Sequence, residues 1–161
     1  MKVLHILHSF PPAFRIGGPA LSVSSLIYEL QNQELTFNTV YATNLDLNKL
    51  INVPIQKETQ INNVKVFYFP ILQFKFFNKI NKYFRRWYLS LSLIKFVFNN
   101  VKSFDIVHIH MPFIASSFAT AIICIFFKVP YIISYRGCLD PERIRQNSFV
   151  KKIYINIVER L

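Results

Sequence analysis

Apolar residues along the chain fall into short continuous runs that alternate with longer segments of helical periodicity. The runs are rich in β-branched and aromatic residues and are bounded by residues that favour turns, which is typical of strands buried on both faces. They predict strands at residues 3–8, 37–42, 64–69, 105–110 and 131–135. Residues 43–62 are polar and irregular, so we expect a loop with some short structure there.

The segments between these strands have the spacing of helices. The first begins at Pro19, which suits the first turn of a helix. Its apolar residues fall at i, i+3, i+4 and i+7, which predicts a helix buried on much of its circumference. These apolar residues are Val23, Leu26, Ile27 and Leu30. Residues 74–100 are expected to be mostly helical, residues 113–127 form a buried helix, and a last helix begins at Ser148.

Strands and helices therefore alternate, which favours parallel pairing through right-handed crossovers. The predicted fold class is α/β, with a Rossmann-like doubly wound parallel sheet. The 161 residues suit one domain. The helix expected from Ser148 meets no terminating Gly or Pro before Leu161, so we expect residues 1–161 to be a truncated part of a longer protein.

Charge and cysteine content indicate which partners and which cellular compartment suit the chain. The chain has 19 Lys and Arg against 8 Asp and Glu, a formal net charge of +11, which attracts anionic partners. Its two cysteines provide no disulfide framework, which favours a reducing, cytoplasmic compartment. The apolar run at 113–127 is shorter than the roughly 20 residues that a membrane-spanning helix needs.

The loop after the first strand ends in Gly17 and Gly18. Glycine lets backbone N–H groups approach a ligand closely, and the following helix N-terminus favours phosphate. These residues are candidate binding residues, with a flexible turn as the alternative. Gly137 is the one other glycine in the sequence, so neither a GxGxxG dinucleotide motif nor a phosphate-binding P-loop occurs.

Two further candidates lie at strand ends. His108 and His110 alternate along one strand, so both imidazoles share a face; His110 ends the strand and is expected to meet a ligand, whereas His108 is expected to be a hydrogen-bonded core residue. Few carboxylates lie nearby to complete a metal site, so we expect no metal. Arg136, just after the last strand, suits an anion or a sugar hydroxyl, and Asp140 either joins it in binding or starts a turn.

Basic and aromatic side chains are interleaved through residues 74–98. This mixture suits an anionic membrane surface, or a helix packed on the sheet with its lysine stems along the apolar surface. Both are favoured over stacking on nucleic acid. The residues concerned are Lys75, Lys79, Lys82, Arg85, Arg86 and Lys95, among Phe76, Phe77, Tyr83, Phe84, Trp87 and Tyr88.

Four stretches together resemble the N-terminal domain of family 4 glycosyltransferases, the retaining group with the GT-B fold. They are LHILHSFPPAFRIGGPA, DIVHIHMPF, VPYIISYRGCLDP and RQNSFVKKIYINIVER, in the family's order and at its usual intervals. The resemblance implies an acceptor-binding domain that faces a C-terminal donor-binding domain, which is absent here and would carry the acidic pair and the basic residues for the donor phosphates. It also implies that Gly17 and Gly18 approach the donor diphosphate, that His110 is a catalytic residue near the transferred sugar, and that Arg136 lines the same cleft.

The implied reaction transfers a sugar, with retention, from a nucleotide-sugar donor to a glycan or lipid-linked acceptor in polysaccharide synthesis. No cofactor is implied, no DxD motif occurs, and the chain alone is expected to be inactive. The implied location is cytoplasmic, peripheral at the inner face of the membrane. Many relatives have Gly and an aromatic residue after the second histidine, but Met111 and Pro112 follow His110 here. A non-catalytic membrane-surface or scaffolding domain and an H-x-H metal hydrolase are the alternatives.

Overall fold

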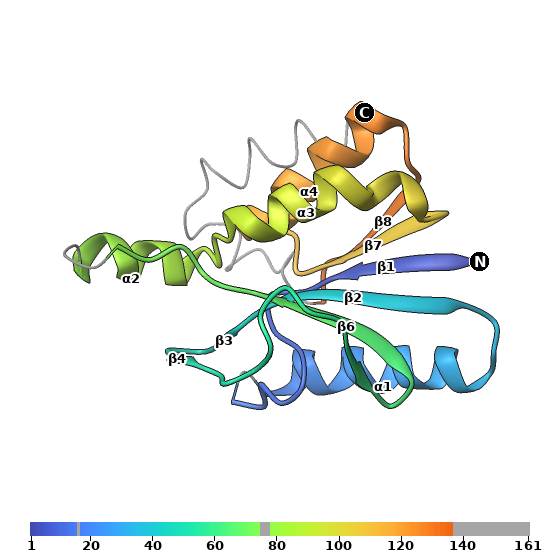
Figure 1. Ribbon diagram of the computed structural model, residues 1–161, viewed down its shortest axis with the longest axis horizontal. Helices are drawn as coiled ribbons and strands as arrows, with labels where there is room; N and C mark the ends of the chain where they lie inside the picture. Colours follow the sequence, from blue (N-terminus) through green and yellow to red (C-terminus); the bar gives the residue numbers. More distant parts are fainter. Residues whose placement is uncertain (16, 75–77, 137–161) are drawn as a thin grey trace.

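A computed structural model describes residues 1–15, 17–74 and 78–136 of the chain. It is an α/β fold in which a six-stranded, mostly parallel sheet lies between one helix on one face and two helices on the other (Figure 1). The strands of this sheet are β1 (Lys2–Ile6), β2 (Phe37–Thr43), β5 (Thr59–Ile61), β6 (Val64–Phe69), β7 (Ile106–His110) and β8 (Tyr131–Ser134), while β3 (Leu45–Asp46) and β4 (Lys49–Leu50) form a separate hairpin. The helices are α1 (Gly18–Asn32), α2 (Asn78–Arg86), α3 (Leu91–Asn100) and α4 (Ala115–Phe127), with a 3-10 turn at Val101–Ser103.

The strand order across the sheet is β5-β6-β2-β1-β7-β8. Numbered in chain order, the five parallel strands read 3-2-1-4-5, which is compatible with a Rossmann-like fold. The order reverses at β1, and in such sheets ligands bind beyond the carboxyl ends of the strands at this reversal. The region beyond the ends of β1 and β7 is therefore where this topology favours a site.

All five predicted strands are present, with bounds that differ by at most a few residues. The predicted loop at 43–62 contains the β3–β4 hairpin and β5. The five predicted strands pair in parallel, whereas β5, which the sequence analysis did not predict, pairs antiparallel with β6 at the edge of the sheet. The strands β3, β4 and β5 are two or three residues long, too short to show a periodicity in the sequence.

Side chains of the strands alternate between two apolar clusters, one on each face of the sheet. Leu4 and Ile6 of β1 pack with Leu93 and Val97 of α3 and with α4. The other face packs against α1 and contains Leu7, Phe10, Val23, Ile27, Val40, Val66 and Tyr68. The two-sided burial explains why the parallel strands read as continuous apolar runs.

The prediction that α1 is buried on much of its circumference is wrong. Val23 and Ile27 are buried, but the side chain of Leu26 is 38% exposed and that of Leu21 is 48% exposed. A helix on the surface of a sheet buries one stripe, and the apolar residues beside that stripe face solvent. The helix begins at Gly18, one residue before the predicted start.

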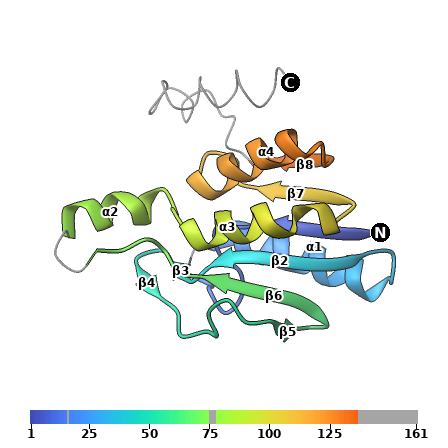
Figure 2. The same ribbon diagram turned by 45° about the horizontal axis from the view of Figure 1, so that its top comes forward.

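The predicted helical segment at 74–100 is divided into two helices with different surroundings. The hydroxyl oxygen of Ser90 accepts a hydrogen bond from the backbone N–H of Leu93 and caps α3, which packs against the sheet. In contrast, α2 extends away from the sheet beyond the carboxyl ends of the strands (Figure 2). The predicted helix at 113–127 is present as α4, and the one from Ser148 lies outside the described residues.

Within the described part of the chain, no helix has the length and apolar character needed to cross a membrane.

Candidate functional site

Three candidate segments that are distant in sequence meet at the carboxyl ends of β1, β7 and β8. The loop after β1 leads into α1, His110 ends β7, and Arg136 follows β8 by two residues. A guanidinium nitrogen of Arg136, Nη1, donates a hydrogen bond to Oγ of Ser22 in α1 at 2.9 Å. The segment after β8 therefore contacts the beginning of α1. Asp140 lies outside the described residues.

The loop between β1 and α1 is anchored by groups from β2, β3 and β6, and the β2 group is the hydroxyl of Thr43, which donates to the carbonyl oxygen of His8. The hydroxyl of Ser9 donates to the carbonyl oxygen of Leu45 at 2.6 Å, and the phenol of Tyr68 donates to the carbonyl oxygen of Pro11. The backbone N–H of Arg15 donates to Oδ1 of the buried Asp46 at 2.9 Å. These bonds fix the position at which α1 begins. The stretch Asp46-Leu47-Asn48 comes nearest to a DxD motif, and the carboxylate of Asp46 is bonded to the loop backbone.

The start of α1 leaves backbone donors available. Gly17 precedes the helix with φ of 81°, a conformation that side chains rarely allow. No side chain of a described residue caps the helix, and its first turn has no acidic residue. A Cβ atom added to Gly17 or Gly18 would have no heavy atom of the described residues within 4 Å. Such a helix terminus attracts anions through its free N–H groups.

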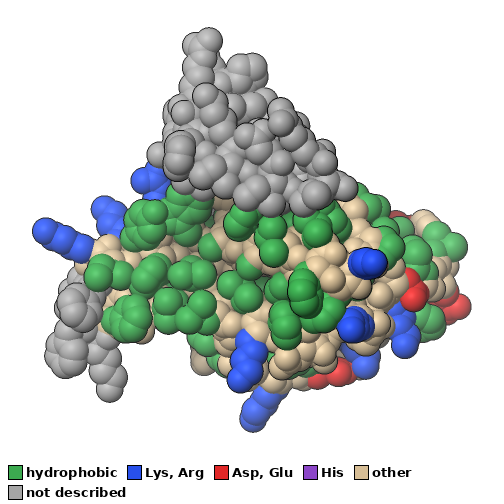
Figure 3. Space-filling view, turned by 90° about the horizontal axis from the view of Figure 1, so that it is seen from above, with side chains coloured by type: hydrophobic (Ala, Val, Ile, Leu, Met, Phe, Trp, Pro, Cys, Tyr) green, Lys and Arg blue, Asp and Glu red, His purple; other side chains and the backbone are tan. Residues whose placement is uncertain are grey.

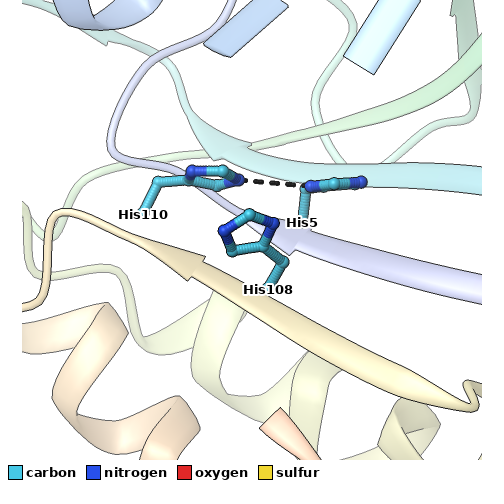
Figure 4. A group of neighbouring side chains, drawn as sticks. All are labelled: His5, His108 and His110. Atoms are coloured by element: carbon cyan, nitrogen blue, oxygen red, sulfur yellow. Dashed lines mark hydrogen bonds between the residues drawn. The ribbon is translucent and has the colours of Figure 1, made fainter. Parts of the chain in front are cut away.

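A cluster of three imidazoles lies on the neighbouring strands β1 and β7 (Figure 4). His108 and His110 share one face of the sheet, as predicted, with ring centroids 3.9 Å apart. The register of β1 and β7 pairs His5 with His108, which adds a third ring that the sequence analysis missed. Nδ1 of His5 lies 3.2 Å from Nε2 of His110.

The hydrogen-bond network assigns the tautomers of two of these rings. Nδ2 of Asn38 donates to the carbonyl oxygen of Thr36 and to Oε1 of Gln31, so its Oδ1 accepts from Nε2 of His5 at 3.0 Å. A neutral His5 then accepts at Nδ1, and Nε2 of His110 donates to it. Nδ1 of His110 is left as an accepting nitrogen that is buried and has no partner among the described residues.

Burial keeps these rings neutral at physiological pH. It lowers the pKa of His5 and of His8 to about 4. Burial also lowers the pKa of His110 well below its usual range, with further contributions from His108, His5 and Arg136. The pKa of His108 is lowered by burial and by the charge of Arg136. The cluster therefore offers neutral hydrogen-bonding groups rather than positive charges.

The accessibility of the two predicted histidines is the reverse of the expectation. The side chain of His110 is 1% exposed, although it ends the strand, and the rings of His5 and His108 lie against it. His108 is half-buried and shares a hydrogen bond of 2.7 Å, through Nε2, with Oγ of Ser134. His108 is hydrogen-bonded as expected, but it is not the deeper of the two.

His8 is a further residue at this edge that the sequence analysis did not select. It follows β1 by two residues, is 5% exposed, and has a buried Nδ1 with no partner among the described residues. Its ring meets that of Tyr88 edge-on, with centroids 5.0 Å apart. The position just after β1 is a sequence signal that points to His8, but its burial depends on the loop that folds over it.

Metal binding was not expected from the sequence, yet the three imidazoles form a group with suitable ligand atoms. One nitrogen from each of His5, His108 and His110 lies within 4.8 Å of the others. Neutral imidazole is the form that binds zinc and similar metals. The existing hydrogen bonds among these rings account for most of their nitrogens without an ion.

Comparison with known proteins adds no assignment to this geometry: no protein-family model matches the chain, and no curated protein matches its sequence.

Proposed function

We propose that the chain is the acceptor-side domain of a retaining glycosyltransferase, which transfers a sugar from a nucleotide-sugar donor to a glycan or lipid-linked acceptor. The observation that supports it best is the meeting of three segments at one sheet edge. These are the uncapped start of α1, the end of β7 at His110 and the residue Arg136, which contacts α1 through Ser22. In this proposal the donor-binding domain lies outside residues 1–161.

Each group has a role in the proposed reaction that follows from its chemistry. The N–H groups of Gly18 and Ala20 would bind diphosphate oxygens, which the positive end of the α1 dipole stabilises, because the N–H of Gly17 donates to the carbonyl oxygen of Phe14 and Pro19 has none. Arg136 would add a fixed positive charge to the same anion. Nδ1 of His110 is its free acceptor but is buried, so it would accept a hydrogen bond from a hydroxyl of the transferred sugar once the neighbouring side chains move apart.

A lipid-linked acceptor at the inner membrane face is part of the proposal because of α2. This helix extends from the body and exposes Ile80 and Tyr83 together with basic side chains. In Figure 3, Lys and Arg side chains project at the end of the molecule where α2 lies. Apolar and basic groups on one extended helix suit the interface of an anionic membrane.

Sugar transfer by the protein encoded by the whole reading frame tests the proposal. The protein would be incubated with a panel of nucleotide sugars and with lipid extracts, and donor consumption and glycosylated products would be followed by mass spectrometry. We expect one donor to be consumed with retention of anomeric configuration. If the folded protein consumes none, a membrane-surface or scaffolding domain becomes the better interpretation.

A metal-dependent hydrolase is the second candidate function, and the cluster of His5, His108 and His110 favours it. Elemental analysis of the purified chain separates the two functions. One transition-metal ion per chain, lost on His108→Ala, would support the hydrolase. A metal content far below one ion per chain, both as purified and after incubation with zinc and gel filtration, would argue against the hydrolase and favour the transferase.

A further inference from the structure

A hollow of about 690 Å³ lies between α2 and the turn that joins β3 to β4. It is separate from the histidine cluster and from the start of α1. Its polar lining consists of Asn48 from the turn, Asn81, Lys82, Arg85 and Arg86 from α2, and Tyr88.

The charge in this hollow is unbalanced. Three cationic side chains line it, and no described carboxylate does. The charge of Asp46 acts on Tyr88, but the carboxylate of Asp46 is buried and accepts hydrogen bonds from the backbone N–H of Arg15. Like charges around one space repel one another, so an anion in that space would be stabilised.

Arg85 is held across the hollow with donors left over. Its Nη1 donates to the carbonyl oxygen of Asn48 at 3.3 Å, which ties α2 to the turn. Its Nε is buried and has no hydrogen-bond partner among the described residues. A buried, charged N–H group without an acceptor is costly, and an oxyanion is the acceptor that a guanidinium binds best.

The neutral groups of the lining are also donors. Burial, with the charge of Asp46, raises the pKa of Tyr88, so its phenol stays protonated and can donate. The side-chain amide of Asn48 can donate as well, and that of Asn81 donates one N–H to the carbonyl oxygen of Phe74 at 2.7 Å and keeps the second. Tyr88 packs against His8 just beyond β1, which brings the hollow next to the carboxyl edge of the sheet.

We propose that this hollow binds a phosphate-type oxyanion, namely the phosphate or diphosphate group of the acceptor. The identification of the ligand as an acceptor rests on the proposed glycosyltransferase function, whereas the anion site rests on the lining alone. A membrane lipid headgroup and a soluble phosphorylated acceptor carry the same chemistry.

Isothermal titration of the 161-residue chain with inorganic pyrophosphate tests the site. We compare Lys82→Gln plus Arg85→Gln with Lys79→Gln plus Lys95→Gln, which removes the same charge from exposed positions outside the hollow. We expect the first pair to weaken binding about tenfold or more, since bonds to charged groups are lost, and the control pair to weaken it less than about threefold.

Equal losses in the two pairs would show general attraction to a basic protein and would overturn the site. Absence of measurable pyrophosphate binding by the wild-type chain would do the same. Because Arg85 also bonds to Asn48, circular dichroism checks the fold of each variant. The single variant Lys82→Gln, at an exposed side chain, repeats the test without touching that bond.

Vesicle co-sedimentation distinguishes the two sources of the anion. If pyrophosphate displaces the chain from phosphatidylglycerol vesicles and the hollow variants no longer bind them, the ligand is a lipid headgroup. If vesicle binding is unaffected while pyrophosphate binding depends on the hollow, the ligand is soluble. Neither readout needs sugar transfer, so a failed transfer assay would overturn the proposed function and leave the anion site standing.

Discussion

The imidazole of His110 combines a fixed tautomer with a neutral charge. Its Nε2–H donates to His5, and that bond is fixed in turn by Asn38 at the other nitrogen of His5. A neutral ring with a free accepting nitrogen can bind a hydroxyl, whereas a charged ring would repel the nearby Arg136. The chemistry of this residue depends on contacts from three strands.

The proposed role of His110 predicts a large loss of activity on truncation. In the full-length enzyme, His110→Ala should lower turnover roughly 10²-fold or more, the range of a group that assists the reacting centre. His108→Gln serves as the control and should reduce stability more than turnover, because His108 bonds to Ser134 within the sheet. An effect of His110→Ala below about threefold in a folded enzyme would remove this residue from the site.

The buried histidines predict a loss of stability in acid. The folded pKa of His8 is about 4, below its unfolded value of 6.5, so the folded state favours the neutral ring. Its contribution is complete above pH 6.5 and is lost as the pH falls toward 4, because the unfolded chain binds the proton first. Between pH 7 and pH 5, the free energy of unfolding should fall by about 2 kcal/mol for this group.

Urea unfolding of wild type and His8→Gln at pH 5, 6 and 7 measures this contribution. Glutamine does not titrate, so the variant should lose about 2 kcal/mol less than wild type over the same interval. The comparison uses the change in the free energy of unfolding with pH. A destabilisation of the variant that is the same at every pH does not alter this change. Parallel slopes for the two proteins would contradict the buried, neutral state of His8.

At the scale of elements, the start of α1 depends on one backbone conformation. Gly17 has φ of 81° and ψ of −143°, a region that is almost exclusive to glycine, whereas Gly18 has no positive φ. In the part of the chain that the structure describes, no heavy atom lies within 4 Å of the position of a Cβ at either residue. Alanine substitutions at the two positions therefore differ in backbone strain but not in steric contact.

Gly17→Ala should destabilise the protein by about 1–3 kcal/mol, while Gly18→Ala should change stability by less than about 1 kcal/mol in either direction. Chemical denaturation of the two variants measures the difference. If both substitutions have the same effect, the strained conformation at Gly17 is not required for the fold.

The helix α2 predicts binding to anionic membranes. Each basic residue near an anionic surface contributes about 1 kcal/mol, so Arg85→Glu plus Arg86→Glu should weaken vesicle binding about tenfold or more. Co-sedimentation with anionic and neutral vesicles, at low and high salt, checks this. Lys2→Glu plus Lys128→Glu, at the opposite edge of the sheet, controls for net charge. Binding that is absent, or equal in both double variants, would argue against a membrane-facing α2.

At the scale of the whole molecule, stability comes from two apolar layers with the sheet between them. The α3–α4 layer contains most of the large aromatic contacts, including Tyr41 packed against Phe67, Phe69 and Phe96. The α1 layer is thinner and leaves the outer residues of that helix exposed. Figure 3 shows hydrophobic side chains gathered on the α3–α4 side of the surface as well.

Two leucines of α3 test whether stability comes from the buried side of this helix. Leu93 is fully buried in the core, whereas the side chain of Leu91 is 56% exposed. Leu93→Ala should destabilise the protein by about 2–5 kcal/mol, through lost burial and a cavity, and Leu91→Ala by less than about 1 kcal/mol. Thermal or urea unfolding gives both values. Similar losses of unfolding free energy for the two variants would mean that α3 does not pack on the sheet as described.

The sequence alone determined the parallel strands, the helices between them and the α/β class, because these depend on local apolar periodicity. It also indicated that Gly17, His110 and Arg136 follow or end strands, and the ends of parallel strands share one edge. Their assignment to sugar transfer stays a proposal.

Only the tertiary structure decided which side chains meet. His5 joins His108 and His110 because β1 lies next to β7, a pairing between residues about a hundred positions apart that no local pattern encodes. The exposed side of α1, the antiparallel β5 and the separation of α2 from α3 likewise depend on what each element packs against. Local sequence fixes the period of an element, whereas strand order and burial come from long-range packing.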